Sequence, residues 1–173
     1  MATKSPILLG LLLTFSLSSC GGNPDDLLLE INQGEGRSRR YSIDELGQFL
    51  TEREQEGEAF SKGELEAVDL LRDIARSRNE VIVNRMRAIS ALSRLQKADN
   101  TDVFVEGLSS EYWGIRWEST KGLSAHPSPR AVQALASRLQ VEKERVVLLD
   151  TVKALAQAGG DEALQALFLV YFD

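Results

Sequence analysis

The sequence has few of the residues from which most catalytic and metal sites are built. Its 173 residues include one histidine, His126, and one cysteine, Cys20. A single cysteine excludes a disulfide within the chain, and no second histidine or cysteine is present to complete a zinc site. P-loop, dinucleotide-binding glycine and nucleophile-elbow patterns are also missing. We therefore expect no catalytic residues, no metal and no cofactor, and a protein that is not an enzyme.

Proline and aromatic residues are also scarce, and the net charge is negative. There are 4 prolines, aromatics make up 6% of the chain, and leucine and alanine are abundant, which together favour helices. Hydrophobic residues make up 43%, enough for one domain with a real core. The net charge of −6 does not attract phosphate backbones, so we expect no nucleic-acid partner.

Residues 1–19 have the pattern of an export signal. Lys4 precedes an apolar run over 6–17, which is shorter than the ~20 residues that a membrane-spanning helix needs. The sequence Leu-Ser-Ser-Cys at 17–20 resembles the lipobox of bacterial lipoproteins. The resemblance implies cleavage before Cys20 and attachment of lipid to its thiol, and hence a membrane-anchored protein of the cell envelope. Alternatives are a plain secretory signal with a chance cysteine, or an uncleaved anchor.

The residues around the cysteine also bear on location and on the connection to the rest of the chain. By the same resemblance, Gly21 after the cysteine implies the outer membrane, facing the periplasm, if the cell is Gram-negative. Residues 20–40 mix glycine, proline and charge, so we expect a flexible tether with at most a short ordered piece at 27–31. A cluster of Arg37, Arg39 and Arg40 either contacts anionic lipid headgroups or is solvated linker charge.

A helical pair is predicted over 41–79. Two capping boxes, each flanked by a hydrophobic staple, predict helices over 42–55 and 61–77. Each box pairs a serine with a glutamate three residues later: Ser42 with Glu45, and Ser61 with Glu64. Charge is segregated nearby, with nine acids and two bases over 42–69 and seven bases and two acids over 70–97. This indicates either pairing between successive helices or a dipolar surface that orients a partner.

An internal repeat runs through the second half of the chain. The segments RMRAISAL (85–92), RWESTKGL (116–123) and LLDTVKAL (148–155) align at steps of 31 and 32 residues. Each is followed by a polar turn and a second apolar stripe with helical spacing. Two sets of equivalent residues are predicted to lie in the core: Met86, Trp117 and Leu149, and then Leu92, Leu123 and Leu155.

The period over 80–173 resembles HEAT repeats of the short, Ala/Leu-rich class similar to phycobilisome-lyase-type repeats. Arg85 and Arg116 match the family's recurrent arginine, whereas the third unit departs with Leu148. The resemblance implies an all-α, HEAT-like α-solenoid of about three helix pairs, with 41–79 as a divergent capping pair. It also implies a non-catalytic protein-binding or scaffolding module. Alternatives are an accessory factor related to chromophore-lyase HEAT-repeat proteins, or an envelope enzyme with an unrecognised site.

Two surfaces are candidates for binding a protein partner. The repeat register points Gln133 and Gln165 outward from the second helices, and Tyr112 is a candidate exposed aromatic anchor. The final segment, 162–173, is strongly apolar and is not followed by a polar capping unit. Its register predicts that Leu164, Leu167, Phe168 and Tyr171 face inward. Leu169 and Phe172 are left with less cover, which predicts a contact for a partner or a second copy of the chain.

Overall fold

Every regular element that the structure describes is a helix. The computed structural model describes residues 24–172, except for the side chains of 170–172, so the predicted signal peptide and Cys20 lie outside the described residues. The helices are α1 (Pro24–Gln33), α2 (Gly36–Gln55), α3 (Lys62–Arg76), α4 (Ile82–Arg94), α5 (Thr101–Gly107), α6 (Trp113–Ala125), α7 (Pro129–Leu139), α8 (Arg145–Ala158) and α9 (Gly160–Phe172). The predicted all-α fold is confirmed.

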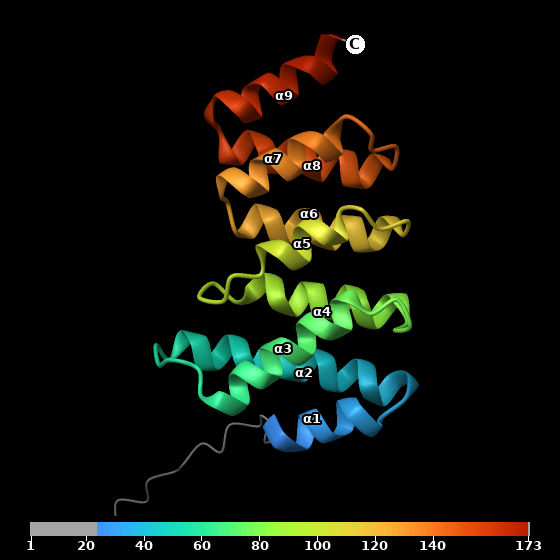
Figure 1. Cartoon of the computed structure of the whole chain (residues 1–173), viewed down its shortest axis with the longest axis vertical. Helices are drawn as coiled ribbons and strands as arrows, with labels where there is room; N and C mark the ends of the chain where they lie inside the picture. The colour runs from blue at the N-terminus through green and yellow to red at the C-terminus, as the bar shows by residue number, and fades with distance from the viewer. Residues whose placement is uncertain (1–23, 173) are drawn as a thin grey trace, which may run out of the picture.

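The helices form pairs that stack into an elongated solenoid (Figure 1). The pairs are α2 with α3, α4 with α5, α6 with α7, and α8 with α9. The first helices of successive pairs pack on one another, and the second helices form a parallel row beside them. α1 packs against α2 and α3 at one end of the stack. The three predicted repeat pairs and the pair before them are therefore present.

The connections between helices alternate between the two sides of the stack. Turns within a pair lie on the left of Figure 1, and loops between pairs lie on the right. We call the right side, formed by the loops at 77–81, 108–112 and 140–144, the between-repeat edge. Consecutive repeats are joined along this edge, so its side chains come from two pairs at once.

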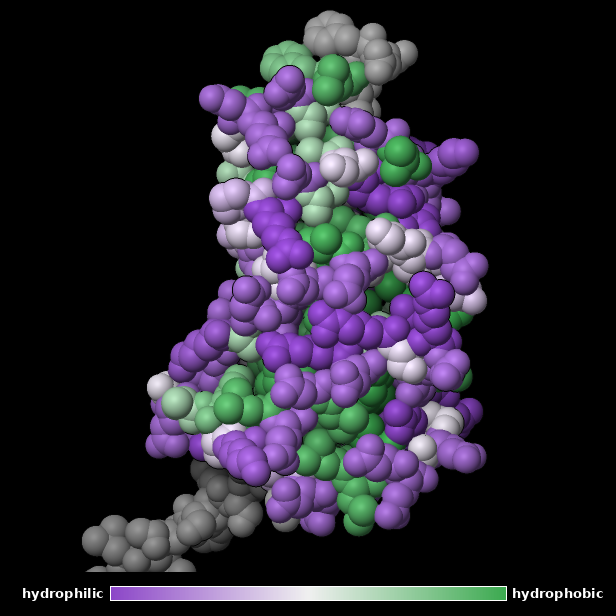
Figure 2. Space-filling model, viewed as in Figure 1, coloured by the Kyte–Doolittle hydropathy of each residue, from purple (hydrophilic) through white to green (hydrophobic). Residues whose placement is uncertain are grey.

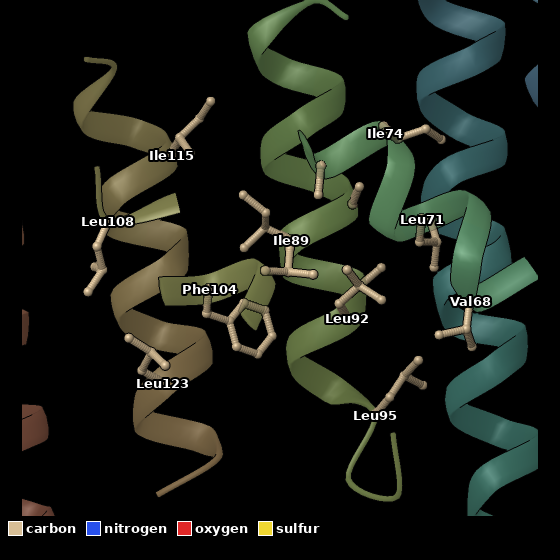
Figure 3. Packing of buried hydrophobic residues seen from close by; sticks show 14 of the residues in the cluster. Val68, Leu71, Ile74, Ile89, Leu92, Leu95, Phe104, Leu108, Ile115 and Leu123 are labelled. Atoms are coloured by element: carbon tan, nitrogen blue, oxygen red, sulfur yellow. The ribbon is translucent and has the colours of Figure 1, made fainter. Parts of the chain in front are cut away.

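The core follows the predicted repeat at its most regular positions. Leu92, Leu123 and Leu155 are all buried, and Phe104 lies between α4 and α6 (Figure 3). The residue before each of these leucines is small because a neighbouring helix lies close. At Gly122, an added Cβ would stand 2.7 Å from the Phe104 ring, which leaves no room for it.

The expected flexible tether is instead helical from Pro24 onward. Leu27 and Ile31 are buried, and their spacing of four residues places both on one face of α1. The helix predicted from Ser42 begins earlier, at Gly36, so Ser42 is not a cap. Its buried hydroxyl donates to the Glu30 carboxylate over 2.7 Å and thus ties α2 to α1. The second capping box is confirmed: Ser61 and Glu64 exchange side-chain and backbone hydrogen bonds at the start of α3.

One set of predicted core residues is less buried than expected. Met86 and Trp117 are half-buried, and Leu149 is 47% exposed. Trp117 stays near the surface because its indole N–H donates to Asp150 over 2.6 Å and the Lys121 ammonium lies 4.5 Å from its ring centre. Trp117 therefore connects α6 to α8 from the side.

The final helix is rotated from its predicted register. Leu164 and Phe168, which were expected to face inward, are 51% and 59% exposed. Ala163 and Ala166 are buried in their place, and Leu167 is partly buried. The small alanines let α9 lie close to the preceding helices, so the larger side chains turn outward. The predicted inward position of Tyr171 lies outside the described side chains.

Candidate functional site

Three loop glutamates recur along the between-repeat edge. Glu80, Glu111 and Glu142 each lie in the loop before the first helix of a pair, and each stands 31 residues after the one before. Arginines from the adjoining helices surround these loops. The three glutamates occupy equivalent positions in consecutive repeats. Differences in the hydrogen-bond donors around their carboxylates therefore show how the repeats differ.

Glu142 is completely enclosed by arginine and backbone donors. Arg116 donates from Nε and Nη2 to the two carboxylate oxygens over 2.8 and 2.9 Å, and Arg138 donates from Nε over 2.8 Å. The backbone amides of residues 143 and 144 also donate to this carboxylate. The Glu142 side chain is 0% exposed and that of Arg116 is 11% exposed. A buried bidentate pair of this kind fixes the geometry between two consecutive repeats.

These donors keep Glu142 ionised despite its burial. Burial by itself would raise the pKa of the carboxyl group, but the hydrogen bonds from Arg116 and Arg138 outweigh it. The pKa of Glu142 is therefore held well below its usual range. The same side chains keep the Arg116 guanidinium charged, since its hydrogen bond to Glu142 raises the pKa of Arg116.

Glu80 is also held by an arginine. Arg39, from α2, donates to one Glu80 carboxylate oxygen from Nε over 3.1 Å and from Nη2 over 2.7 Å. Asn84 donates to the other oxygen over 2.7 Å. Burial opposes ionisation here too, but these hydrogen bonds lower the pKa of Glu80. The first and third loop glutamates are therefore both neutralised within the chain.

Glu111 differs, because within residues 24–172 no side chain donates to its carboxylate. It is exposed, and the nearest equivalent of Arg116 in its repeat is Arg85, whose Nε donates instead to the Ala75 carbonyl over 3.1 Å. The second arginine is absent as well, because Gly107 stands where Arg138 stands one repeat later. A Cβ at position 107 would lie 3.1 Å from Ser119 Cβ and closer still to its hydroxyl, so Ser119 would have to shift to admit a side chain. The close packing of α5 on α6 therefore favours glycine at the position where an arginine would hold Glu111.

A hollow of about 620 Å³ lies at this open position, between α3 and α5. Three arginines line it, namely Arg76, Arg78 and Arg85, together with Ser109 and Tyr112. Arg76 is paired with Glu106 across the hollow over 2.8 Å. Neither Arg78 nor the two terminal nitrogens of Arg85 have a hydrogen-bond partner among the described residues. We call this space the arginine hollow.

The short length of α5 explains why the row of second helices, α3, α5 and α7, has hollows on its surface. α5 spans Thr101–Gly107, whereas α3 and α7 on either side are longer. A second hollow of about 430 Å³ lies between α5 and α7, and Gln133 and Ser109 are among its lining residues. The two hollows share Ser109 and so adjoin each other. In the view of Figure 2, hydrophilic residues dominate the middle of the stack, and hydrophobic residues are more visible toward its α1–α3 end.

The structure places the predicted binding residues in three different parts of the surface. Tyr112 is 41% exposed at the arginine hollow, and Gln133 is exposed at the second hollow. Gln165 is exposed on α9, and Leu169 there is 50% exposed. The side chain of Phe172 and the whole of Cys20 lie outside the described residues. The outward orientation of Gln133 and Gln165 is confirmed, and a binding role for any of these residues stays a prediction.

The segregated charge of the sequence is explained in part by pairing between α2 and α4. Asp44 forms an ion pair with Arg87. The buried Glu54 carboxylate accepts hydrogen bonds from the backbone amides of Gln96 and Lys97 over 2.6 and 2.7 Å. Acidic residues of α2 therefore pair with groups on the following repeat. Arg78 and Arg85 are the basic residues that this pairing leaves facing the arginine hollow.

Residues 24–172 contain no group of three His, Cys, Asp or Glu side chains placed to hold a metal ion. In the same range, no helix has the length and hydrophobicity required to cross a bilayer. His126 is half-buried against the Phe104 ring at 5.6 Å between ring centres, and its Nε2 lies 3.1 Å from the Ser93 carbonyl oxygen. The histidine is therefore part of the packing between α4 and α6 rather than a solvated turn residue.

Sequence reasoning identified Arg85 and Arg116 as equivalent but missed the arginine hollow. The signal that could have found it is the spacing of Glu80, Glu111 and Glu142, combined with the exchange of arginine for glycine at position 107. Both lie in the same 31-residue period that revealed the repeat. What the period alone could not show is that Arg85 turns toward Ala75 instead of toward the next loop.

Comparison with known proteins agrees with this architecture. No curated protein matched the sequence. A family model for HEAT repeats matches residues 68–156, which is just over half of the chain and runs from α3 through most of α8. The stacked helix pairs, their small contact residues and this match together show that the chain belongs to the HEAT-repeat family.

Proposed function

We propose that this protein is a non-catalytic protein-binding or scaffolding module that is anchored to a bacterial envelope membrane through a lipidated Cys20. The protein-binding part of this proposal is supported by the two adjoining hollows that flank α5 in the row of second helices. HEAT-repeat proteins typically bind other proteins along such extended surfaces. The membership of this chain in the family supports the same use here.

The proposed contact surface has two parts. The first is the pair of hollows around α5, with Tyr112 and Gln133 at their rims. The second is the outer face of α9, where Leu164, Phe168 and Leu169 are each at least half exposed. Exposed apolar groups of this kind are typical of contact sites, so this face is proposed to bind a partner or a second copy of the chain.

Site-specific crosslinking tests the proposal. A photoreactive residue replaces Gln133 or Leu169 in the full chain, and the control replaces Gln48, which is exposed on α2 at the other side of the stack. We expect Gln133 to give one defined crosslinked band that mass spectrometry identifies as a protein. We expect Leu169 to capture either the same partner or a second copy. Equal crosslinking from all three positions would contradict a defined binding surface.

The membrane anchor is a separate part of the proposal and has its own test. Because α1 begins at Pro24, a lipid on Cys20 would hold the solenoid only a few residues from the bilayer, instead of at the end of a long tether. We expect metabolic labelling with a palmitate analogue to mark the full-length protein, and Cys20→Ala to lose both the label and membrane association. An unlabelled wild-type protein would contradict the anchor, and with it the outer-membrane location.

A further inference from the structure

We propose that the arginine hollow binds an acidic peptide segment of the protein partner, with Arg85 receiving a carboxylate from that segment. This inference rests on the proposed protein-binding function and specifies the chemistry of the partner. Two arginines at equivalent positions in consecutive repeats support it. Arg116 is paired with a carboxylate of the chain, and Arg85 is not.

The filled position shows what the arginine at the start of a first helix binds. Arg116 receives the Glu142 carboxylate in a bidentate geometry, with both nitrogen–oxygen distances below 3 Å. That carboxylate comes from the loop of the following repeat. The site is built for one planar anion, because a guanidinium and a carboxylate match each other through two parallel hydrogen bonds.

The open position has the same arginine but lacks the carboxylate. Arg85 is half-buried and uses only Nε, toward the Ala75 carbonyl. Its two terminal nitrogens have no partner within residues 24–172 and are not enclosed there, so they are free to receive an anion from outside the chain. Glu111, which would supply the carboxylate by analogy with Glu142, remains exposed at the rim of the hollow.

The hollow has the size and charge to accept a peptide instead. Its volume of about 620 Å³ exceeds that of a single side chain. Arg78 adds a second unpaired cation, and Arg76 with its Glu106 partner forms one wall. Ser109 and Tyr112 also line the hollow and offer hydroxyl and aromatic contacts, which suit peptide backbone and side chains. Two cations without partners in one concave site favour a ligand carrying at least two carboxylates.

The test measures binding of a fluorescent peptide to the purified full-length protein in detergent micelles. The probe carries four consecutive glutamates between glycine and serine residues, and the matched control peptide carries four glutamines. We expect the glutamate peptide to bind and the glutamine peptide not to bind. Arg85→Gln should weaken binding about tenfold or more, as expected for loss of a charged hydrogen-bond partner. Arg145→Gln, at an exposed position at the start of α8, should leave it unchanged.

A second variant keeps the test independent of folding defects. Glu111→Gln removes a competing negative charge from the rim, so it should tighten peptide binding several-fold, which no loss of structure can produce. Equal binding of the two peptides, or equal effects of Arg85→Gln and Arg145→Gln, would overturn the proposal. So would Arg85-dependent binding to phosphatidylglycerol vesicles with no binding of the peptide, since the ligand would then be a membrane surface.

The outcome separates this inference from the proposed function itself. If the glutamate peptide fails while the photoreactive residue at 133 still captures a protein, the partner is retained and only its acidic character is wrong. If both experiments fail, the proposed protein-binding function is overturned as well.

Discussion

Replacing Glu142 with alanine should destabilise the protein more than any substitution of an exposed charge. The change leaves the guanidinium groups of Arg116 and Arg138 without their shared carboxylate, where their side chains are only 11% and 19% exposed. It also removes the acceptor for two backbone amides. Breaking a buried ion pair from one side costs about 3–5 kcal/mol, because the remaining charge stays buried and poorly hydrated. For a chain of this size, that corresponds to a drop in Tm of roughly 6–20 °C.

The measurement is urea unfolding followed by circular dichroism at 222 nm, with Glu66→Ala as the matched control. Glu66 pairs with Lys62 over 3.5 Å at the start of α3, but both side chains are largely exposed, so the control should cost less than about 1 kcal/mol. Similar free energies of unfolding for the two variants would refute the reasoning, because the burial of Glu142 would then carry no energetic weight.

Two further predictions concern packing and pH. Gly122→Ala should destabilise the fold by about 1–3 kcal/mol in the same urea assay, since the new methyl group would overlap the Phe104 ring. Gly63→Ala, at an open position in α3, should not destabilise it, and equal losses would contradict close packing at Gly122. The free energy of unfolding should also fall as pH drops below the ordinary glutamate pKa of about 4.3, because the pKa values of Glu142, Glu80 and Glu64 are lowered in the folded state. This stability is fully present above that pH and is lost as these groups protonate. Glu142→Gln should therefore show a smaller decline in the free energy of unfolding between pH 7 and pH 3. Parallel pH dependences of that free energy in the variant and the wild type would contradict the role of Glu142.

The sequence predicted the repeating parts of the fold because they follow a simple period. Leu92, Leu123 and Leu155 are buried as expected, since each faces the same neighbouring helices in its own repeat. The capping box at Ser61 and Glu64 was predicted for a similar reason: all its interactions lie within four residues. Short-range patterns of this kind do not depend on what the rest of the chain does.

The first helices were mispredicted because a local pattern was overridden by packing. Ser42 and Glu45 have the spacing of a capping box. A helix can nevertheless continue through such a pair, because tertiary packing overrides local preferences. Leu27 and Ile31 of α1 are buried at the end of the stack. Once α1 is fixed there, α2 begins at Gly36, where a positive φ of 58° allows the sharp turn from α1.

The candidate site depended on contacts that no single period specifies. Arg116 and Glu142 are separated by 26 residues and meet only because two repeats stack. Trp117 shared the register of core residues, yet its N–H found an acceptor at the surface of α8. The arginine hollow results from an absence, the missing side chain at Gly107, and its effect on Glu111 becomes evident only when the helices are placed side by side.

The two ends of the described chain lie at opposite ends of the stack, with α1 at one and α9 at the other (Figure 1). Neighbouring helices in such a stack lie about 8–10 Å apart, so each pair adds a fixed increment of length and a fixed rotation. In the proposed scaffolding role, the number of pairs would therefore set the distance between the two ends of the solenoid. Deleting one pair would shorten that reach by one increment and turn everything bound beyond it to a new direction.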